Sequence, residues 1–540
     1  MFFYPILFED TAIITFGELV FNIPANSYFL WKNIKYIFVI FTFLSNLIIC
    51  NILVSAIFNL IHPKKNKKIT TIKNGDFSIL LGQSYETGEN ITIPEKGLYQ
   101  NILVTGAIGS GKTSSAMYPI TKQLINYQAH SSEKKLGMLI LDVKGNYYYQ
   151  VKQFAKQAGR LNDIIPIQIS GKYKYNPLDK PNLKPTVLAN RLKTILLLFS
   201  PNNSESYWID KAETALAEAI KLCRLYNNNY VTFSEIHNLI TDTNYYTSKI
   251  HYLREQFLLN KFNKKQTYDL LSAIKFFEKE FNTLDSRTLN ILRSEITRIT
   301  NCFVSDCDIT RTFCPAKKEI NFYGFEDVIN SGKIVVLKMN INEYKNLSKI
   351  IATYLKLDFQ TDVLRRLSKP HNEIRPVAFV SDEYSEYVSA TDANFFSQSR
   401  ESKCINVVAT QSYTSLLDAL NNKYSVEVIV QNLVNKLWFR SDDVFTIEDA
   451  QKQLGKADKE KSSRTISENA KETSYNLFTR SLESKNSNIS ESINTYLQYD
   501  YIYDTNFFTQ QLDTFDCLSF ISNGNKILKP AKLKMLPYFK

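Results

Sequence analysis

Cysteine is sparse in this chain of 540 residues, and it never occurs with the spacing of a metal site. The seven cysteines include no C-x-x-C pair. Cys302, Cys307 and Cys314 lie within one short stretch, but no histidine lies near them. This pattern argues against a metal or cluster site. It favours reduced thiols in a cytosolic domain.

Charge is missing from the segment Tyr36–Ile61, which is mostly apolar. As a helix rising about 1.5 Å per residue it would extend roughly 39 Å, enough to cross a hydrocarbon core about 30 Å thick. We therefore predict a transmembrane helix at residues 36–61. A cluster of lysines follows at residues 64–68, and such a cluster places the rest of the chain in the cytoplasm.

The segment before this helix, residues 1–35, lacks the basic start of a signal peptide. Glu18 and Pro24 interrupt its apolar residues. We interpret it as an extracytoplasmic or interfacial segment, and a second membrane helix within residues 1–30 is the alternative.

Glycine is absent from residues 185–301, where apolar side chains recur at helical spacing, as at Leu188, Leu192 and Ile195. We therefore expect an all-α domain at residues 185–320. Strand-like runs lie on both sides, at residues 69–184 and 321–540, and we expect these to be two parts of one α/β domain. Residues 456–492 are rich in Ser, Lys, Glu and Asn, which predicts a polar irregular stretch.

Short apolar runs in the two flanking parts predict the strands of a parallel sheet with crossover helices. These runs are residues 101–105, 137–141, 164–169, 333–337, 377–380, 405–409 and 436–439. The length of the chain suggests about three domains. A hydrophobic content of 44% is sufficient for a core.

The most specific motif in the chain is a phosphate loop at residues 106–113, which fits G-x-x-x-x-G-K-[ST] at every fixed position. A buried strand leads into it and a helix-compatible stretch follows, so backbone N–H groups would converge on one point. Lys112 would reach the β- and γ-phosphates of ATP, and Thr113 would hold Mg²⁺. The predicted nucleotide-binding residues are Gly106, Ala107, Gly109, Ser110, Gly111, Lys112 and Thr113.

Hydrolysis also needs an acidic partner, and the strand at 377–380 ends in Ser381-Asp382-Glu383. We expect this strand beside the phosphate-loop strand, where Asp382 would hold Mg²⁺ together with Thr113. Glu383 would orient the attacking water. A second buried strand ends at Asp142, where open α/β sheets place ligands.

Three further polar residues are candidates for the same site. Gln411 follows the run 405–409 and would contact both water and the γ-phosphate. Arg400 is the candidate for an arginine that reaches a neighbouring subunit's nucleotide. Arg440, after the run 436–439, is the competing arginine.

These motifs resemble those of the type IV secretion coupling proteins, the TraG/TraD-like ATPases of conjugation. The resemblance covers nearly the whole chain and rests on the phosphate loop, the large helical insertion and several short motifs. These motifs are Leu141–Gly145, Tyr175–Asp179, Tyr207-Trp208, Phe379–Glu383, Ala409–Ser412 and Phe439–Asp442. The chain departs from the family by having Asp142-Val143-Lys144-Gly145-Asn146 where Asp-Pro-Lys-Gly-Glu is usual, and by one clear membrane helix instead of two.

The resemblance implies a RecA-like motor, hexameric and anchored in the bacterial inner membrane. It would use ATP to move relaxase-bound single-stranded DNA towards a type IV secretion channel. A net charge of +12 is compatible with an anionic partner such as nucleic acid. The alternatives are a receptor ATPase for protein substrates of a secretion system and a segregation-type translocase of double-stranded DNA. A non-hydrolysing scaffold is disfavoured because Lys112, Thr113, Asp382 and Glu383 are all present.

Overall fold

The computed structural model divides the chain into two compact units, Met1–Asp76 and Phe77–Lys540. The residues that it describes are 7–8, 11–16, 19–24, 77–199, 206–368, 370, 373–468, 473–476, 481–484 and 489–539. In the first unit, β1 (Leu7–Phe8), β2 (Thr11–Phe16) and β3 (Leu19–Pro24) form an antiparallel sheet. The predicted membrane segment at 36–61 lies outside the described residues, and none of the helices described elsewhere is both long and apolar enough to cross a membrane.

Within the described part of the second unit, one sheet of eleven strands carries the fold, in the order β5-β4-β18-β17-β12-β6-β11-β10-β7-β9-β8. All seven runs predicted from the sequence are strands of this sheet, and each pairs in parallel with at least one other of the seven. They are β6 (Ile102–Thr105), β7 (Gly137–Leu141), β8 (Ile164–Ile167), β9 (Ile334–Leu337), β10 (Val377–Ser381), β11 (Cys404–Thr410) and β12 (Asn435–Phe439). The predicted α/β class with a parallel sheet is therefore confirmed.

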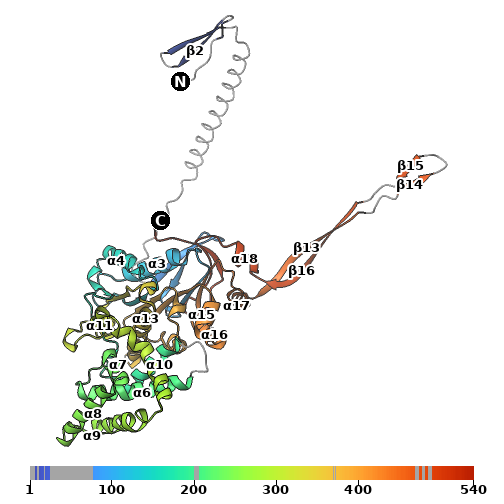
Figure 1. Ribbon diagram of the computed structural model, residues 1–540. Helices are drawn as coiled ribbons and strands as arrows, with labels where there is room; N and C mark the ends of the chain where they lie inside the picture. Colours follow the sequence, from blue (N-terminus) through green and yellow to red (C-terminus); the bar gives the residue numbers. More distant parts are fainter. Residues whose placement is uncertain are drawn as a thin grey trace. The chain divides into compact units, whose positions relative to one another are not determined.

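Both faces of the parallel strands are buried, which explains their uninterrupted apolar sequences. Side chains alternate between the faces of a strand, so Leu139 and Leu141 of β7 belong to one core, and Met138 and Ile140 belong to another. The helices α3 (Tyr118–Asn126) and α4 (Tyr147–Gln157) contribute to the second core. The long helix α13 (Ile341–Leu364) contributes to the first (Figure 1).

Four antiparallel strands extend the sheet beyond β12, and the sequence analysis did not predict them. They are β17 (Asp516–Phe520), β18 (Ala531–Met535), β4 (Ser78–Ser84) and β5 (Asn90–Pro94). β18 places the end of the chain beside a strand that precedes the phosphate loop. No local pattern could reveal this pairing, because the paired residues are more than four hundred positions apart in the sequence.

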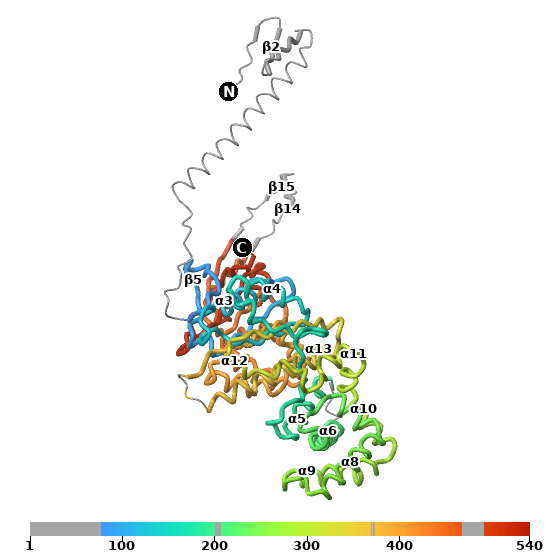
Figure 2. The backbone as a smooth tube through the Cα atoms, turned by 90° about the vertical axis from the view of Figure 1, so that its left-hand side faces the viewer, coloured from blue at the N-terminus to red at the C-terminus, as the bar shows by residue number. Residues whose placement is uncertain are grey.

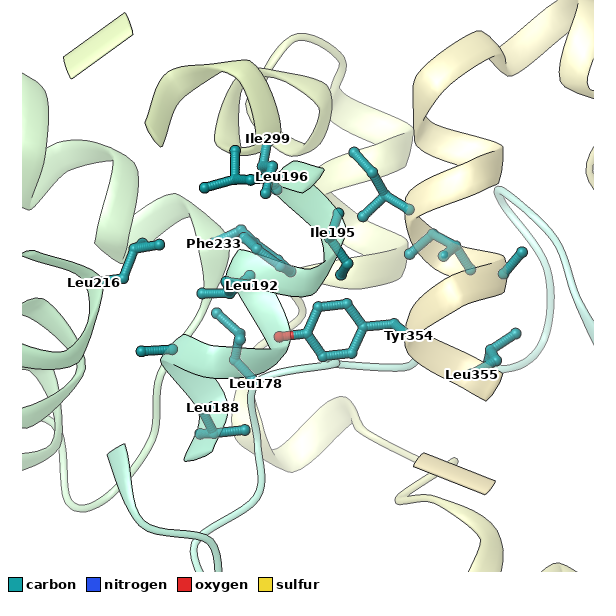
Figure 3. Packing of buried hydrophobic residues seen from close by; sticks show 14 of the residues in the cluster. Leu178, Leu188, Leu192, Ile195, Leu196, Leu216, Phe233, Ile299, Tyr354 and Leu355 are labelled. Carbon is teal, nitrogen blue, oxygen red and sulfur yellow. The ribbon is translucent and has the colours of Figure 1, made fainter. Parts of the chain in front are cut away.

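Helices fill the interval between β8 and β9, where the all-α domain at 185–320 was expected. They are α5 (Pro185–Leu197), α6 (Ser206–Tyr226), α7 (Phe233–Thr241), α8 (Thr243–Leu258), α9 (Lys264–Lys275), α10 (Ser286–Val304) and α11 (Cys307–Phe313). Figures 1 and 2 show α6, α8, α9 and α10 gathered at one end of this unit. Figure 3 shows how Leu192 and Ile195 of α5 lie against Phe233 of α7 and Tyr354 of α13, which joins the helices to the sheet-bearing part.

The stretch 456–492 differs from the irregular structure that its composition predicted. Strand β13 (Lys456–Glu468) pairs antiparallel with β16 (Ile489–Tyr501) along its whole length, and β14 (Thr473–Asn476) pairs with β15 (Ser481–Ser484). An ion pair of 3.0 Å between Lys461 and Asp500 joins the two long strands. Polar composition misled the prediction because both strands of a two-stranded ribbon are edge strands, whose side chains and outward backbone groups face solvent, and polar residues are compatible with such strands.

The remaining helices that border the sheet are short. They are α2 (Glu95–Leu98), α12 (Phe325–Ser331), α14 (Asp392–Gln398), α15 (Tyr413–Leu420), α16 (Lys423–Asn432), α17 (Val444–Leu454) and α18 (Thr505–Gln510).

A buried asparagine ties the start of the phosphate-loop strand to its neighbours. The Asn101 amide nitrogen donates to the carbonyl oxygens of Phe396 in α14 and Asn432 in α16, at 3.1 and 2.9 Å. Its side-chain oxygen accepts from the Asn406 amide of β11 at 2.6 Å, and its main-chain oxygen accepts from the Asn435 amide of β12 at 2.8 Å. Asn101 thereby links β6 to both adjacent strands and to two helices.

We expect Asn101→Ala to destabilise the second unit by roughly 2–5 kcal/mol. Loss of the side-chain amide leaves its buried hydrogen-bond partners unsatisfied, which costs about 1–3 kcal/mol of stability. Asn101 also has a φ of 63°, and an alanine there would add about 1–2 kcal/mol of left-handed strain. Thermal and urea denaturation of the two proteins would measure the difference.

Asn229→Ala is the matched control, because Asn229 has a φ of 62° but is exposed. The loss of stability in Asn229→Ala should therefore come from left-handed strain alone. Equal losses in the two variants would mean that the Asn101 hydrogen bonds contribute nothing to stability.

Candidate nucleotide-binding site

The phosphate loop, the acidic pair and Gln411 come together at one edge of the sheet. Thr105 at the end of β6 pairs with Thr410 at the end of β11, and Ser381 at the end of β10 pairs with Val408. The loops that follow these parallel strands therefore meet at the same edge. Residues of these loops line a cavity of about 400 Å³, among them Lys112, Thr113, Asp382, Glu383 and Gln411.

The strand order corrects one expectation. Asp382 follows β10, which does not lie beside the phosphate-loop strand, because β11 is inserted between β6 and β10. The acidic pair still reaches the loop, since side chains at the ends of next-but-one strands can meet across the intervening strand. Gln411, at the end of β11, therefore lies between the two halves of the site.

The start of the phosphate loop is held by the protein itself. The Gly106 N–H donates to the Gln411 carbonyl oxygen at 3.2 Å, and the Ala107 N–H donates to the Arg440 carbonyl oxygen at 2.7 Å. The Ser110 carbonyl oxygen accepts from the Phe515 N–H at 3.1 Å. Gly106 and Ala107 thus anchor the loop with their own N–H groups, which makes them unsuitable as phosphate donors in this conformation.

Lys112 packs back onto this loop. Its Nζ donates to the carbonyl oxygens of Gly106 and of Ala107, the latter at 3.1 Å. Burial lowers the pKa of Lys112, and the nearby carboxylates of Asp382 and Glu383 oppose that shift. The ammonium group is thereby held inside the cavity at the point where the helical turn η1 (Thr113–Met117) begins.

Thr113 and Asp382 are in direct contact, although 269 positions separate them in the sequence. The Thr113 hydroxyl donates to Asp382 Oδ2 at 2.9 Å. Burial raises the pKa of Asp382 to about 6, while the Thr113 hydrogen bond lowers it. A hydroxyl and a carboxylate oxygen at this distance fit the hard oxygen ligands that Mg²⁺ prefers.

Glu383 has an uncommon backbone conformation and an ionic partner that the sequence analysis did not assign. Its φ and ψ are both 49°, in the left-handed region. Its Oε1 forms an ion pair of 2.8 Å with Lys144 Nζ. The hydrogen bond to Glu383 raises the pKa of Lys144. Lys144 also lines the cavity, and the Asp-x-Lys-Gly motif was the signal that could have identified it.

Asp142, expected to face a ligand, instead caps helix α4. Its carboxylate accepts backbone N–H groups from Lys144 at 3.2 Å and from Asn146 and Tyr147 at 3.0 Å. Burial raises the pKa of Asp142, and these three hydrogen bonds oppose the shift. The cap fixes the turn that carries Lys144 to the cavity.

The two candidate arginines lie in different places. Arg400 is exposed in the turn that leads into β11, at the opposite end of that strand from Gln411. A strand of this length spans about 20 Å, so Arg400 cannot reach the cavity of its own chain. Arg440 lies beside the phosphate loop, where its main-chain oxygen accepts from Ala107.

Aromatic residues late in the chain complete the cavity, and sequence reasoning missed them. Tyr538 and Phe539 line it together with Tyr118. The Tyr538 N–H donates to the Ser114 carbonyl oxygen at 3.0 Å, which attaches this segment to the turn after the phosphate loop. Tyr538 and Phe539 belong to no recognisable motif, so no local signal indicated their position at the cavity.

A family model described as the TraM recognition site of TraD and TraG matches residues 376–496. The predicted resemblance to type IV secretion coupling proteins is confirmed. A search of curated protein sequences gives no match.

Solved structures of the conjugative coupling protein TrwB have a similar fold. The unbound form of the bacterial protein TrwBdeltaN70 is 12% identical, with a TM-score of 0.55 over 83% of this chain and 87% of its own. The plasmid coupling protein TrwB in complex with ADP and Mg²⁺ is 12% identical, with a TM-score of 0.53 over 82% of this chain and 87% of its own. The complex with the GTP analogue GDPNP is 11% identical, with a TM-score of 0.54 over 82% and 87%. At these identities the likeness to the coupling proteins shows the fold alone.

The packing around the loop predicts that two of its glycines respond differently to alanine. Both have positive φ, 78° at Gly109 and 95° at Gly111. A Cβ on Gly111 would lie 2.5 Å from the Phe515 ring, whereas one on Gly109 would meet nothing within 4 Å. Gly111→Ala should displace the loop and weaken binding of a non-hydrolysable ATP analogue at least tenfold more than Gly109→Ala does.

Calorimetric titration of the two variants and the unchanged protein would measure these affinities. The same affinity in both variants would show that contact with Phe515 does not fix the loop. Near-ultraviolet circular dichroism would show whether either variant has lost its tertiary packing.

Proposed function

We propose that this protein is a membrane-anchored ATPase that couples ATP hydrolysis to delivery of relaxase-bound single-stranded DNA into a type IV secretion channel. The observation that carries the ATPase part is the contact of Thr113 with Asp382 in a cavity that also contains Lys112 and Glu383. Phosphate-loop, metal-holding and water-orienting groups thus converge from segments far apart in the chain. The fold shared with conjugative coupling proteins supports the transport part.

Each side chain in the cavity has a distinct task in this proposal. Lys112 and the backbone N–H groups of Gly109 and of residues 111–113 hold the β- and γ-phosphates. Thr113 and Asp382 hold Mg²⁺, which neutralises phosphate charge when bound. Glu383 orients the attacking water, and the ion pair with Lys144 positions its carboxylate. Gln411 contacts both water and the γ-phosphate from the strand end between the two halves.

The membrane anchor and the assembly are part of the same proposal. The uncharged segment 36–61 supports an inner-membrane helix, and the lysines at 64–68 support a cytoplasmic location for the ATPase part. If Arg400 acts on a nucleotide, it acts on that of a neighbouring copy, because it cannot reach the cavity of its own chain. A homo-hexamer is the assembly that the coupling-protein resemblance implies.

The first test measures ATP turnover of the full chain in detergent, titrated with single-stranded and with double-stranded DNA. We expect single-stranded DNA to stimulate turnover more strongly. Lys112→Ala should abolish turnover because the cation in the phosphate cradle is lost. Glu383→Gln should retain nucleotide binding but lose hydrolysis, because the amide cannot orient water as the carboxylate does.

The other outcomes identify the alternatives. Equal or greater stimulation by double-stranded DNA would favour a segregation-type translocase. ATP turnover that is unchanged by DNA but is stimulated by secreted proteins would favour a receptor for protein substrates. Undiminished turnover in Lys112→Ala would refute the assignment of the phosphate loop.

The second test asks which arginine completes the neighbouring site. If Arg400 acts between subunits, Arg400→Ala should bind ATP but lose turnover by about a thousandfold or more. Mixing Arg400→Ala with Lys112→Ala subunits should restore part of the activity, because some interfaces then pair an intact phosphate loop with an intact arginine.

Arg440→Ala is the comparison variant. Loss of turnover in Arg440→Ala, without rescue of Arg400→Ala by mixing, would transfer the role to Arg440. Normal turnover in both single variants would exclude an arginine from the neighbouring subunit at either position.

A further inference from the structure

One wall of the nucleotide cavity is aromatic and takes no part in the chemistry proposed above. The groups that would bind phosphate, Mg²⁺ and water lie at the strand ends, at Lys112, Thr113, Asp382 and Glu383. Tyr538 and Phe539 line the same cavity from the other end of the sequence. Nothing in the phosphate-loop motif requires these two rings.

The segment that carries the rings is fixed to the phosphate loop. Strand β18 runs antiparallel to β17, and β17 runs antiparallel to β12, so β18 has the same direction as β12 and β6 and ends at the edge of the sheet where the cavity lies. The Met535 N–H donates to the Phe515 carbonyl oxygen at 2.9 Å, and the Phe515 N–H donates to the Ser110 carbonyl oxygen at 3.1 Å. Residues 535–539 are thus joined to the loop through Phe515, and to the turn after the loop by the bond from Tyr538 to Ser114.

The rings support one another by edge contacts. Tyr538 contacts Tyr118 with ring centroids 5.0 Å apart and planes at 85°, and it contacts Phe539 at 5.4 Å and 81°. Phe539 also contacts Phe515 at 6.1 Å and 71°. These edge-to-face arrangements restrict the orientation of the rings. Phe539 nevertheless remains 59% exposed at the cavity, so an apolar surface beside the phosphate loop is left open.

We propose that Tyr538 and Phe539 form the platform on which the purine base of the bound nucleoside triphosphate stacks. This inference rests on the proposed ATPase function and adds the part of the site that binds the base. An exposed aromatic ring next to a phosphate cradle presents a π-face to a planar group, and base–aromatic stacking stabilises such a contact. Because every base has a π-face, stacking discriminates poorly between bases, and the protein should bind ATP and GTP with similar affinity.

The experiment compares ligands with and without a base, using the full chain in detergent. Calorimetry would give dissociation constants for a non-hydrolysable ATP analogue and for inorganic tripolyphosphate, both with Mg²⁺. Phe539→Ala should weaken binding of the ATP analogue by roughly 5- to 150-fold, the range for a base stacked on an aromatic ring. Its affinity for tripolyphosphate should be unchanged, and Phe539→Trp should restore binding of the analogue.

Tyr424→Ala is the matched control, because Tyr424 is an aromatic residue of α16 that is 78% exposed and does not line the cavity. It should leave both affinities unchanged. An unchanged affinity of Phe539→Ala for the ATP analogue would overturn the platform. An equal loss for tripolyphosphate and the ATP analogue would also overturn it, because the substitution would then have disturbed the phosphate loop.

The two affinities distinguish failure of the platform from failure of the proposed function. If the unchanged protein binds the ATP analogue but hydrolyses no ATP, the proposed ATPase activity fails, and the platform is still decided by the two affinities. If the unchanged protein binds neither ligand, both proposals fail together.

Discussion

The parallel register of β6, β11 and β10 is the constraint on which the rest of the site depends. Parallel strands that start at one edge of a sheet end at the other, so their following loops meet without further guidance. Asn101 reinforces this register at the beginning of β6, where its buried amide links β11 and β12 to the phosphate-loop strand. Fully satisfied polar groups in a core specify one arrangement of the elements around them. A slip of one residue here would separate Thr113 from Asp382.

The same edge concentrates charge that the folded chain keeps partly buried. Burial raises the pKa of Asp382 and lowers that of Lys112, so each group is less stable in its charged form than it would be in water. A divalent cation and a polyphosphate would satisfy both. The ion pair of Lys144 with Glu383 has a different character, because 61% of the Lys144 side chain and 27% of the Glu383 side chain are exposed, so solvent screens the pair. The Glu383 carboxylate is thus held by a contact that costs little to break.

The helical stretch and the late aromatic residues illustrate how distant segments serve one cavity. Helices α5 to α11 separate β8 from β9 in the sequence, but the two strands pair directly in the sheet. The insertion therefore leaves the sheet intact. Antiparallel strands β17 and β18 return the last described residues to the phosphate loop. A cavity whose walls come from residues near 110, 382, 411 and 538 depends on the adjacent strands from β18 to β10 in the sheet.

The sequence by itself determined the phosphate loop, all seven parallel strands and the helical stretch at 185–301. Each of these depends on residues close together in the chain, namely a glycine-lysine motif, an apolar run or a helical period. Only the tertiary structure decided that β11 lies between β6 and β10 and that Lys144 pairs with Glu383. It also decided that residues 456–468 and 489–501 form a ribbon, and that Tyr538 and Phe539 reach the cavity. These features depend on contacts between residues whose separation along the chain ranges up to several hundred positions, and no local pattern encodes which distant partner a side chain will meet.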